Sequence, residues 1–349
     1  MIEELQIKDY RGIPDLTVAP LGRLNLLVGM NAAGKTSVLE AIELVSSVAD
    51  MLPLRSNCYR RGEILGGGSN GPEGTHLDPR HLFYAHRYNT PIEISAASED
   101  ITSKVRVEIE KREKEGDPRN IRLHWLPENV SKTIELMPQK GTSVVSVSPG
   151  TFPWELQPVK RCLFLPSSGL SQMQIMHQLD SVLLTPNETF VTEALWAIDS
   201  GIERLAVSYD TLAVDGKFGG VIVNCKDRPP RLPIGTFGEG IWRMLGIALS
   251  LTWCKDGILL IDDIDSGLHY TVMEKMWKLI FETSKTLNVQ VFATTHSRDC
   301  IESLASIARS DVYDNSEVMI HRIEAGKTRS VSYSEGAVNA VAEFGNEVR

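Results

Sequence analysis

The chain has 349 residues, of which 42% are hydrophobic, and it carries a formal net charge of -9. This length can hold one large domain or two ordinary domains with a substantial core. The acidic balance excludes a general attraction to nucleic-acid phosphates, so any DNA-binding surface would be a local patch. The five cysteines are scattered without a CxxC pair, which argues against a zinc site.

The first residues lack the features of a targeting segment. The start MIEELQIKDY is acidic where a signal peptide needs a basic end and an apolar core. No uninterrupted apolar run of the sequence approaches the roughly 18 residues of a membrane span. We therefore expect a cytoplasmic protein without a membrane partner.

The first 50 residues alternate between predicted strands and a helix. The runs EELQIKDYRG and DLTVAP predict two short strands around a turn, and LNLLV at 24–28 is apolar throughout apart from one asparagine, as in a buried central strand. After a glycine-containing segment, Val38, Ile42 and Val45 recur on one helical face. Strand, loop and helix therefore follow one another directly.

The middle of the chain differs from the first 50 residues in composition and in its predicted elements. Residues 56–80 are rich in glycine and polar residues, which predicts a flexible surface loop. Between residues 90 and 160, four short strand-like runs separated by turn residues predict an antiparallel subdomain. Helix is expected over about 178–206, followed by strands in RLAVSYD and GVIVNCK.

The last third alternates between helices and strands. A long helix through GIWRMLGIALSLTW is followed by the predicted strands GILLI and VQVFA, each with a helix after it, and by closing strands in EVMIHRI and RSVSYS. This spacing favours right-handed crossovers in a parallel sheet. We predict an α/β fold with a mixed, mostly parallel central sheet, an antiparallel β subdomain and a helical subdomain.

The segment GMNAAGKTS, residues 29–37, fits the pattern G-x-x-x-x-G-K-[ST] between a predicted strand and a predicted helix. Glycines let successive backbone N–H groups point at phosphate oxygens, and the helix N-terminus adds its dipole. In this motif the lysine reaches the β- and γ-phosphates of ATP and the hydroxyl ligates Mg²⁺. A chance glycine turn is the alternative, but the position between strand and helix favours phosphate binding. The candidate cofactor-binding residues here are Gly29, Asn31, Ala32, Ala33, Gly34, Lys35, Thr36 and Ser37, with Lys35 also a catalytic candidate and Thr36 a metal ligand.

Three carboxylates follow the predicted strand GILLI. Mg²⁺ takes oxygen ligands and keeps several waters, so Asp262 is expected to hold it while Asp263 orients or deprotonates the attacking water. Asp265 is the alternative base. A solvated Asp-rich turn is the other interpretation, which the phosphate loop makes weaker.

One histidine lies where a catalytic group could act. VQVFATTHS places His296 at the carboxyl end of a strand, the edge where open α/β sheets bind ligands. His296 is therefore a catalytic candidate that would contact a γ-phosphate. A structural histidine is the alternative.

Five patches together resemble one family. GMNAAGKTSVLEAI, the preceding DYRG, GTFGEGIWRMLGIAL, LLIDDIDSGLH and VFATTHS are similar to the RecF/SMC-related branch of ABC-type ATPases, the AAA-15/AAA-21 group. That group includes the ATPase halves of overcoming-lysogenization-defect (OLD) proteins and of several phage-defence systems. The resemblance implies a P-loop NTPase of the ABC-ATPase head type that binds ATP and Mg²⁺ between two copies, hence a homodimer or a higher oligomer.

The resemblance also implies roles for single residues. Arg11 would lie near the base or ribose, Ser266–His269 would form a dimer-contact loop, and His296 would act as a switch histidine. The signature residues, which face the γ-phosphate bound by the second copy, are Gly238, Glu239 and Gly240, with Arg243 one turn along. Asp263 stands where the family usually has Glu, and Gly238 where it usually has Ser, which leaves a non-hydrolysing ATP sensor open as an alternative.

These patches define the expected domain organisation. The chain is predicted to be a single domain over 1–349, with a nucleotide-binding core at 1–50 and 236–349, an antiparallel β subdomain at 51–177, and a helical and connecting region at 178–235.

The expected function is an ATP-driven switch that gates a separate effector, in phage defence or DNA repair. A fused nuclease would need a Toprim domain, which nothing after residue 310 resembles, so a nuclease is expected on a separate chain. A non-hydrolysing scaffold for such an effector is the alternative. DNA is a possible partner that the net charge does not support. Two small basic clusters are better explained as solvated surface: Arg55, Arg60 and Arg61, and Lys111, Arg112 and Lys114.

Overall fold

A computed structural model gives the fold, in which the chain forms two compact units. The first contains Met1–Gly22, Gly29–Cys162 and His321–Ser332, and the second Arg23–Val28, Leu163–Ile320 and Tyr333–Arg349. The predicted division into a nucleotide-binding core and two subdomains stays a prediction. The structure describes residues 1–48, 50, 52–65, 76–77, 79–110, 119–127, 129–139, 142–146, 162–208, 220–229, 231–308 and 317–333.

The first unit contains a nine-stranded sheet in the order β2-β1-β6-β7-β8-β9-β10-β5-β4. The antiparallel strands predicted between residues 90 and 160 are confirmed. β1 and β2 join this sheet because β1 pairs antiparallel with β6. The strands are β1 (Glu4–Tyr10), β2 (Ile13–Val18), β4 (Ile64–Leu65), β5 (His76–Leu77), β6 (Ile92–Ala97), β7 (Thr102–Glu110), β8 (Arg119–Leu126), β9 (Val130–Gln139) and β10 (Thr142–Ser146).

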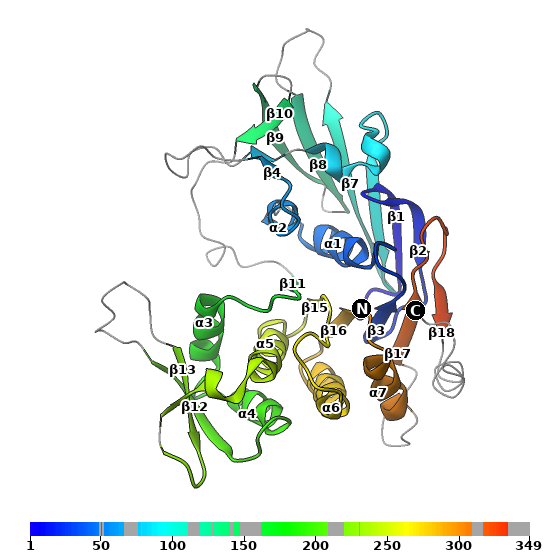
Figure 1. Ribbon diagram of the computed structural model, residues 1–349. Helices are drawn as coiled ribbons and strands as arrows, with labels where there is room; N and C mark the ends of the chain where they lie inside the picture. The colour runs from blue at the N-terminus through cyan, green and yellow to red at the C-terminus, as the bar shows by residue number, and fades with distance from the viewer. Residues whose placement is uncertain are drawn as a thin grey trace. The chain divides into compact units, whose positions relative to one another are not determined.

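Helix α1 (Lys35–Ser46) packs against β1, β6 and β7 of this sheet (Figure 1). Its predicted apolar face is confirmed, because Val38, Ile42 and Val45 are all buried. The indole N–H of Trp125 on β8 donates to the carbonyl oxygen of Leu44, 3.1 Å away. The helix that follows the predicted phosphate loop is therefore fixed to the sheet along its length.

The loop predicted from residue 56 begins later than expected. Helix α2 (Leu52–Arg60) includes the first residues of the predicted loop, 56–60. Leu54 and Cys58 lie one turn apart on this helix and are both buried, which holds it in place. Two short 3₁₀ helices follow at Pro79–Leu82 and Tyr84–His86. Residues 66–75 of the predicted loop lie outside the described residues.

A six-stranded sheet in the order β11-β15-β16-β3-β17-β18 is centred on the second unit. The prediction of parallel strands is confirmed for its centre, where β15 pairs parallel with β16 and β16 with β3. All residues of these three strands are buried. Their carboxyl ends therefore share one edge of the sheet. The strands are β3 (Leu24–Val28), β11 (Cys162–Leu165), β15 (Ile258–Ile261), β16 (Gln290–Thr294), β17 (Val318–Arg322) and β18 (Val331–Tyr333).

Helices and a small sheet complete the second unit. The predicted long helix is α5, whose buried residues pack with α3 and α4 (Figure 1). The predicted strands RLAVSYD and GVIVNCK are confirmed as an antiparallel pair, β12 and β13. The elements are α3 (Gln172–Val182), α4 (Glu188–Trp196), β12 (Ile202–Ser208), β13 (Gly220–Cys225), β14 (Leu232–Pro233), a 3₁₀ helix at Ile234–Phe237, α5 (Glu239–Trp253), α6 (Tyr270–Thr286) and α7 (Arg298–Ala308).

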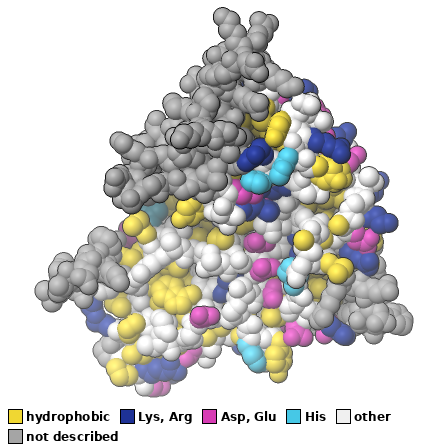
Figure 2. Space-filling model, turned by 45° about the horizontal axis from the view of Figure 1, so that its top comes forward, with side chains coloured by type: hydrophobic (Ala, Val, Ile, Leu, Met, Phe, Trp, Pro, Cys, Tyr) yellow, Lys and Arg dark blue, Asp and Glu magenta, His cyan; other side chains and the backbone are white. Residues whose placement is uncertain are grey.

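Charges of both signs are interspersed among the described side chains on the face shown in Figure 2. In the predicted basic cluster, Arg60 forms an ion pair with Glu43 at 2.7 Å and Arg61 forms one with Glu40 at 2.8 Å. Both guanidinium groups are therefore paired with carboxylates of the same chain. The second cluster, Lys111, Arg112 and Lys114, lies outside the described residues. No helix within the described ranges is both long and apolar enough to cross a membrane.

Candidate functional site

The backbone between β3 and α1 takes the form that the phosphate-loop motif predicts. Gly29 has φ 140°, and a Cβ there would lie 2.3 Å from the carbonyl oxygen of Ile323, so only glycine fits. Gly34 has φ 102° and directly precedes α1, and Ala32 also has a positive φ, 61°. No side chain caps the start of α1 and its first turn has no acidic residue. An uncapped helix N-terminus of this kind favours an anion.

The Lys35 side chain folds back onto the loop. Its Nζ donates to the carbonyl oxygens of Gly29 and Met30, at 2.8 and 2.9 Å. Lys35 is buried, so these carbonyls hold the ammonium group within the loop that the motif assigns to phosphate. Among the other predicted loop residues, Asn31 and Ala32 are exposed, Ala33, Gly34 and Thr36 are half-buried, and Ser37 is buried.

Arg11 lies in a buried cluster of charged groups at the side of α1. Its Nε lies 2.7 Å from Oε2 of Glu40, and its Nη1 lies 2.6 Å from Oε1 of Glu63. The other oxygen of Glu40 accepts from Nε of Arg61, whose Nη2 donates to Oγ of Ser37 at 3.1 Å. These contacts join α1 to the end of β1 and to the turn after α2. They give Arg11 a structural role, and its contact with a base or ribose stays a prediction.

In the second unit, two threonines at the carboxyl end of β16 orient two of the aspartates after β15. Oγ1 of Thr294 donates to Oδ1 of Asp262 at 2.7 Å and accepts from the N–H of Asp263 at 2.8 Å. Oγ1 of Thr295 donates to Oδ1 of Asp265 at 2.5 Å. Both pairs form because β15 and β16 are parallel neighbours. The sequence places the threonines at this edge, but their bonds to the carboxylates were not predicted.

Asp263 and His296, predicted as base and switch residue, face each other. Nε2 of His296 lies 4.0 Å from Oδ1 of Asp263, and the two side chains are 43% and 42% exposed. Asp263 has φ 44°, a left-handed conformation that Asp adopts more readily than most residues. A water molecule can therefore reach this carboxylate, whereas Asp265 is bonded to Thr295. The assignment of Asp263 as the base stays a prediction.

Arg243 on α5 ties down the segment that carries the aspartates, a role that the sequence did not predict. Its guanidinium donates to the backbone oxygens of Pro166, Asp262 and Asp263 at 2.8, 2.7 and 2.8 Å, and to that of Ile264 at 3.4 Å. Burial lowers the pKa of Arg243 to about 10, although the nearby carboxylates raise it. The group is therefore a buried cation at neutral pH that holds backbone carbonyls.

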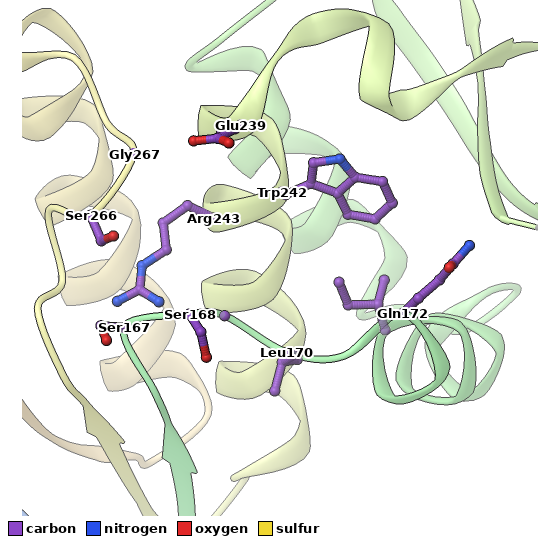
Figure 3. Close-up of a pocket in the computed structure, with 11 residues that line it drawn as sticks. Ser167, Ser168, Leu170, Gln172, Glu239, Trp242, Arg243, Ser266 and Gly267 are labelled. Atoms are coloured by element: carbon purple, nitrogen blue, oxygen red, sulfur yellow. The ribbon is translucent and has the colours of Figure 1, made fainter. Parts of the chain in front are cut away.

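The start of α5 explains the glycines of the signature motif. Gly238 has φ 85° and ψ -177°, a conformation essentially restricted to glycine, which accounts for the absence of serine there. A Cβ on Gly240 would lie 3.2 Å from the carbonyl oxygen of Gly267, so the helix approaches the predicted dimer-contact loop closely. Glu239 and Gly267 both line a pocket of about 530 Å³, into which Trp242 also faces (Figure 3). The predicted signature residues and the predicted dimer-contact loop therefore lie side by side.

The donor groups fit a metal ion bound together with a nucleotide. In the described part of the chain, no group of three or more His, Cys, Asp or Glu side chains could hold a metal by itself. Mg²⁺ commonly binds one or two carboxylates together with phosphates and waters. Asp262, oriented by Thr294, offers one such carboxylate.

Comparisons with known proteins agree with these features. The model of a family described as AAA ATPase domain, AAA_15, matches residues 1–123 and 198–301. An "ATP/GTP phosphatase" of Helicobacter pylori is 23% identical over 343 residues, which are 88% of this chain and 89% of that protein. An "OLD nuclease" of Thermus scotoductus is 47% identical over 57 residues, only 16% of this chain and 10% of the nuclease.

One solved structure carries a comparison of fold. The SmcHead bound to the C-winged helix domain of ScpA superposes with a TM-score of 0.50 at 14% identity, covering 95% of this chain and 98% of that chain. At this identity the likeness concerns the fold alone. The predicted α/β fold of the ABC-ATPase head type is confirmed.

Proposed function

The chain belongs to the AAA ATPase domain family (AAA_15) and is an ATP-binding ATPase, and from this premise we propose that it works as one head of an ATP-dependent pair. The observation that carries the proposal is the order of the parallel strands. β3, β16 and β15 are neighbours, so their carboxyl ends share an edge. The phosphate loop follows β3 directly, and the aspartates follow β15. Such edges bind ligands in open α/β sheets.

Each group then has a defined task in hydrolysis. The N–H groups of the loop and the Lys35 ammonium bind phosphate oxygens, and Thr36 and Asp262 would hold Mg²⁺. The bound metal ion supplies positive charge that offsets the charge of the phosphates. Asp263 accepts the proton of the attacking water, and His296 contacts the γ-phosphate from the adjacent strand end. Its distance of 4.0 Å from Asp263 supports this pairing of roles.

A second copy of the chain completes the site in this proposal. The signature residues Gly238–Gly240 of the second copy contact the γ-phosphate. Support comes from the start of α5, where no side chain caps the backbone N–H groups, although Glu239 places a negative charge in the first turn. The dimer-contact loop packs beside it, since Gly240 closely approaches Gly267.

Closure and reopening of the pair would control the activity of a separate effector protein such as a nuclease, in phage defence or DNA repair. Support for this setting is the short similarity to an OLD nuclease. The net charge of -9 restricts any contact with DNA to a local patch.

Sizing of the protein tests the pair directly. In an Asp263→Asn background, which slows hydrolysis, we expect ATP with Mg²⁺ to double the mass measured by light scattering, while ADP leaves it unchanged. The matched control is Asp263→Asn with Lys35→Ala, which should stay at the smaller mass in ATP. An Asp263→Asn protein of unchanged mass in saturating ATP contradicts the proposal.

A further inference from the structure

The Arg61 side chain bridges two residues of the helix that follows the phosphate loop. Its Nη2 donates to Oγ of Ser37 at 3.1 Å, and its Nε donates to Oε1 of Glu40 at 2.8 Å. Ser37 and Glu40 lie one turn apart on α1, so they share a face of the helix. The planar guanidinium carries its donors in a fixed fork, which lets one side chain hold both acceptors. Arg61 therefore clamps the first turn of α1 through Ser37, which lies two residues after Lys35.

The clamp is itself held in place by buried charges. Glu40 is fully buried, and its second oxygen lies 2.7 Å from Nε of Arg11. Arg11 in turn pairs with Glu63, two residues after Arg61, at 2.6 Å. Two arginines and two glutamates thus balance their charges, as buried ionic groups require. Because Glu40 is held by Arg11, the carboxylate oxygen that Arg61 binds has a fixed position beside Ser37.

We infer that Arg61 is a positioning residue of the nucleotide site, an inference that rests on the proposed function. It acts through Ser37 and Glu40, which fix the first turn of α1. The N–H groups of that turn and the Lys35 side chain are the groups that bind phosphate. Groups held in their binding geometry beforehand lose less freedom when the ligand arrives, which strengthens binding.

The neighbouring arginine offers a matched control. Arg60 also pairs with a glutamate of α1, but with Glu43, two turns beyond Lys35, at 2.7 Å. Arg61 is 33% exposed, so a glutamine there meets water rather than an apolar core. Loss of its hydrogen bonds should raise the KM for ATP about 5- to 10-fold in Arg61→Gln, with kcat changed less than about 2-fold. Arg60→Gln should keep the KM of the wild type within about 2-fold.

A double-mutant cycle tests whether Arg61 acts through Ser37. Ser37→Ala should raise the KM to a similar extent, and the double variant should be no worse than the poorer single variant. If the increases in KM of the two single variants multiply in the double variant, the inference is overturned. Arg61→Lys keeps the positive charge beside Glu40 but lacks the forked guanidinium donors. It should therefore preserve the fold and still raise the KM. This variant replaces Arg61→Gln if Arg61→Gln fails to fold.

Hydrogen exchange without nucleotide separates this inference from the proposed function. The amides that close the first turns of α1, starting with the N–H of Val38 that donates to the carbonyl oxygen of Gly34, should exchange about 5- to 10-fold faster in Arg61→Gln than in Arg60→Gln, because one hydrogen-bonded clamp is lost. If Lys35→Ala binds ATP like the wild type, the proposed function fails whatever the exchange result. Equal exchange in the two arginine variants, or faster exchange with an unchanged KM, overturns the positioning role.

Discussion

Two regions that the proposed function assigns to nucleotide binding are held by different kinds of partner. Beside the phosphate loop, charged side chains pair with opposite charges, as Arg11 does with Glu40 at 2.7 Å. At the edge after β15, Asp262 and Asp265 instead accept hydrogen bonds from neutral threonine hydroxyls. The buried cation there, Arg243, donates to backbone carbonyls.

This difference matches what each region would bind in the proposed function. A carboxylate paired with arginine has its charge compensated, and such pairs serve to fix a helix. A carboxylate oriented by a hydroxyl keeps its full negative charge for a cation. The first arrangement therefore suits a rigid anion site, and the second suits a metal ion. Four variants can break or sharpen this comparison.

Arg243→Met should have the largest effect, on stability. It leaves the carbonyls of the segment after β15 without their buried donor, and each unsatisfied buried group costs about 1–3 kcal/mol. We expect the free energy of unfolding, measured with urea, to fall by about 3–5 kcal/mol. Arg298→Met is the control, because Arg298 is exposed and pairs along its own helix with Glu302; it should change stability by less than about 0.5 kcal/mol. Equal decreases in the free energy of unfolding in Arg243→Met and Arg298→Met would show that Arg243 does not tether this segment.

Asp263→Asn should lower kcat about 100-fold or more, because general-base catalysis contributes about 10²–10⁴-fold. ATP affinity should change little, because Asp263 acts on water. Asp265→Asn should lower kcat less, since Thr295 already occupies one of its oxygens. Steady-state kinetics decide between them. Full activity in Asp263→Asn, with loss in Asp265→Asn, would move the base to Asp265.

Thr294→Val should raise the Mg²⁺ concentration needed for half-maximal activity about 10-fold, the lower end of the effect of removing a group that orients a metal ligand. Valine has nearly the shape of threonine but cannot donate to Asp262. Thr295→Val is the matched control, because its hydroxyl holds Asp265 instead. Identical Mg²⁺ titrations for the two variants would remove Asp262 from the metal site.

Glu43→Gln should act on the pH dependence of stability. Burial raises the pKa of Glu43 from 4.5 to about 7, although Arg60 lowers it. Folded protein therefore keeps a proton that the unfolded chain loses between these values, so stability falls as pH rises through this window, by at most about 1.4 kcal/mol per pH unit. Urea denaturation at pH 5, 6 and 7 should show a flatter profile for the variant. Parallel profiles would contradict the raised pKa.

The sequence predicted best what depends on neighbouring residues. The loop pattern ending at Lys35, the buried strand before it and the aspartates after GILLI are local signals, and each lies where its spacing indicates. The departure at Gly238 also had a local cause, its positive φ, but only the backbone geometry reveals it.

What the sequence missed depends on packing between distant segments. Arg243 and the carbonyl of Pro166 are 77 positions apart, and Arg61 and Ser37 are 24 apart. A single sequence does not say which helix face will meet which strand end. The pairing of β1 with β6 was missed for the same reason, because it joins segments separated by more than 80 residues.

The central claim is that ATP binds at Lys35 with its metal at Asp262. Isothermal titration calorimetry with ATP, in the presence and absence of Mg²⁺, tests it most directly. We predict tight, Mg²⁺-dependent binding by the wild type, at least about 100-fold weaker binding by Lys35→Ala because charge-assisted bonds to phosphate are lost, and binding by Asp262→Asn that no longer depends on Mg²⁺. Wild-type affinity in Lys35→Ala would contradict the account.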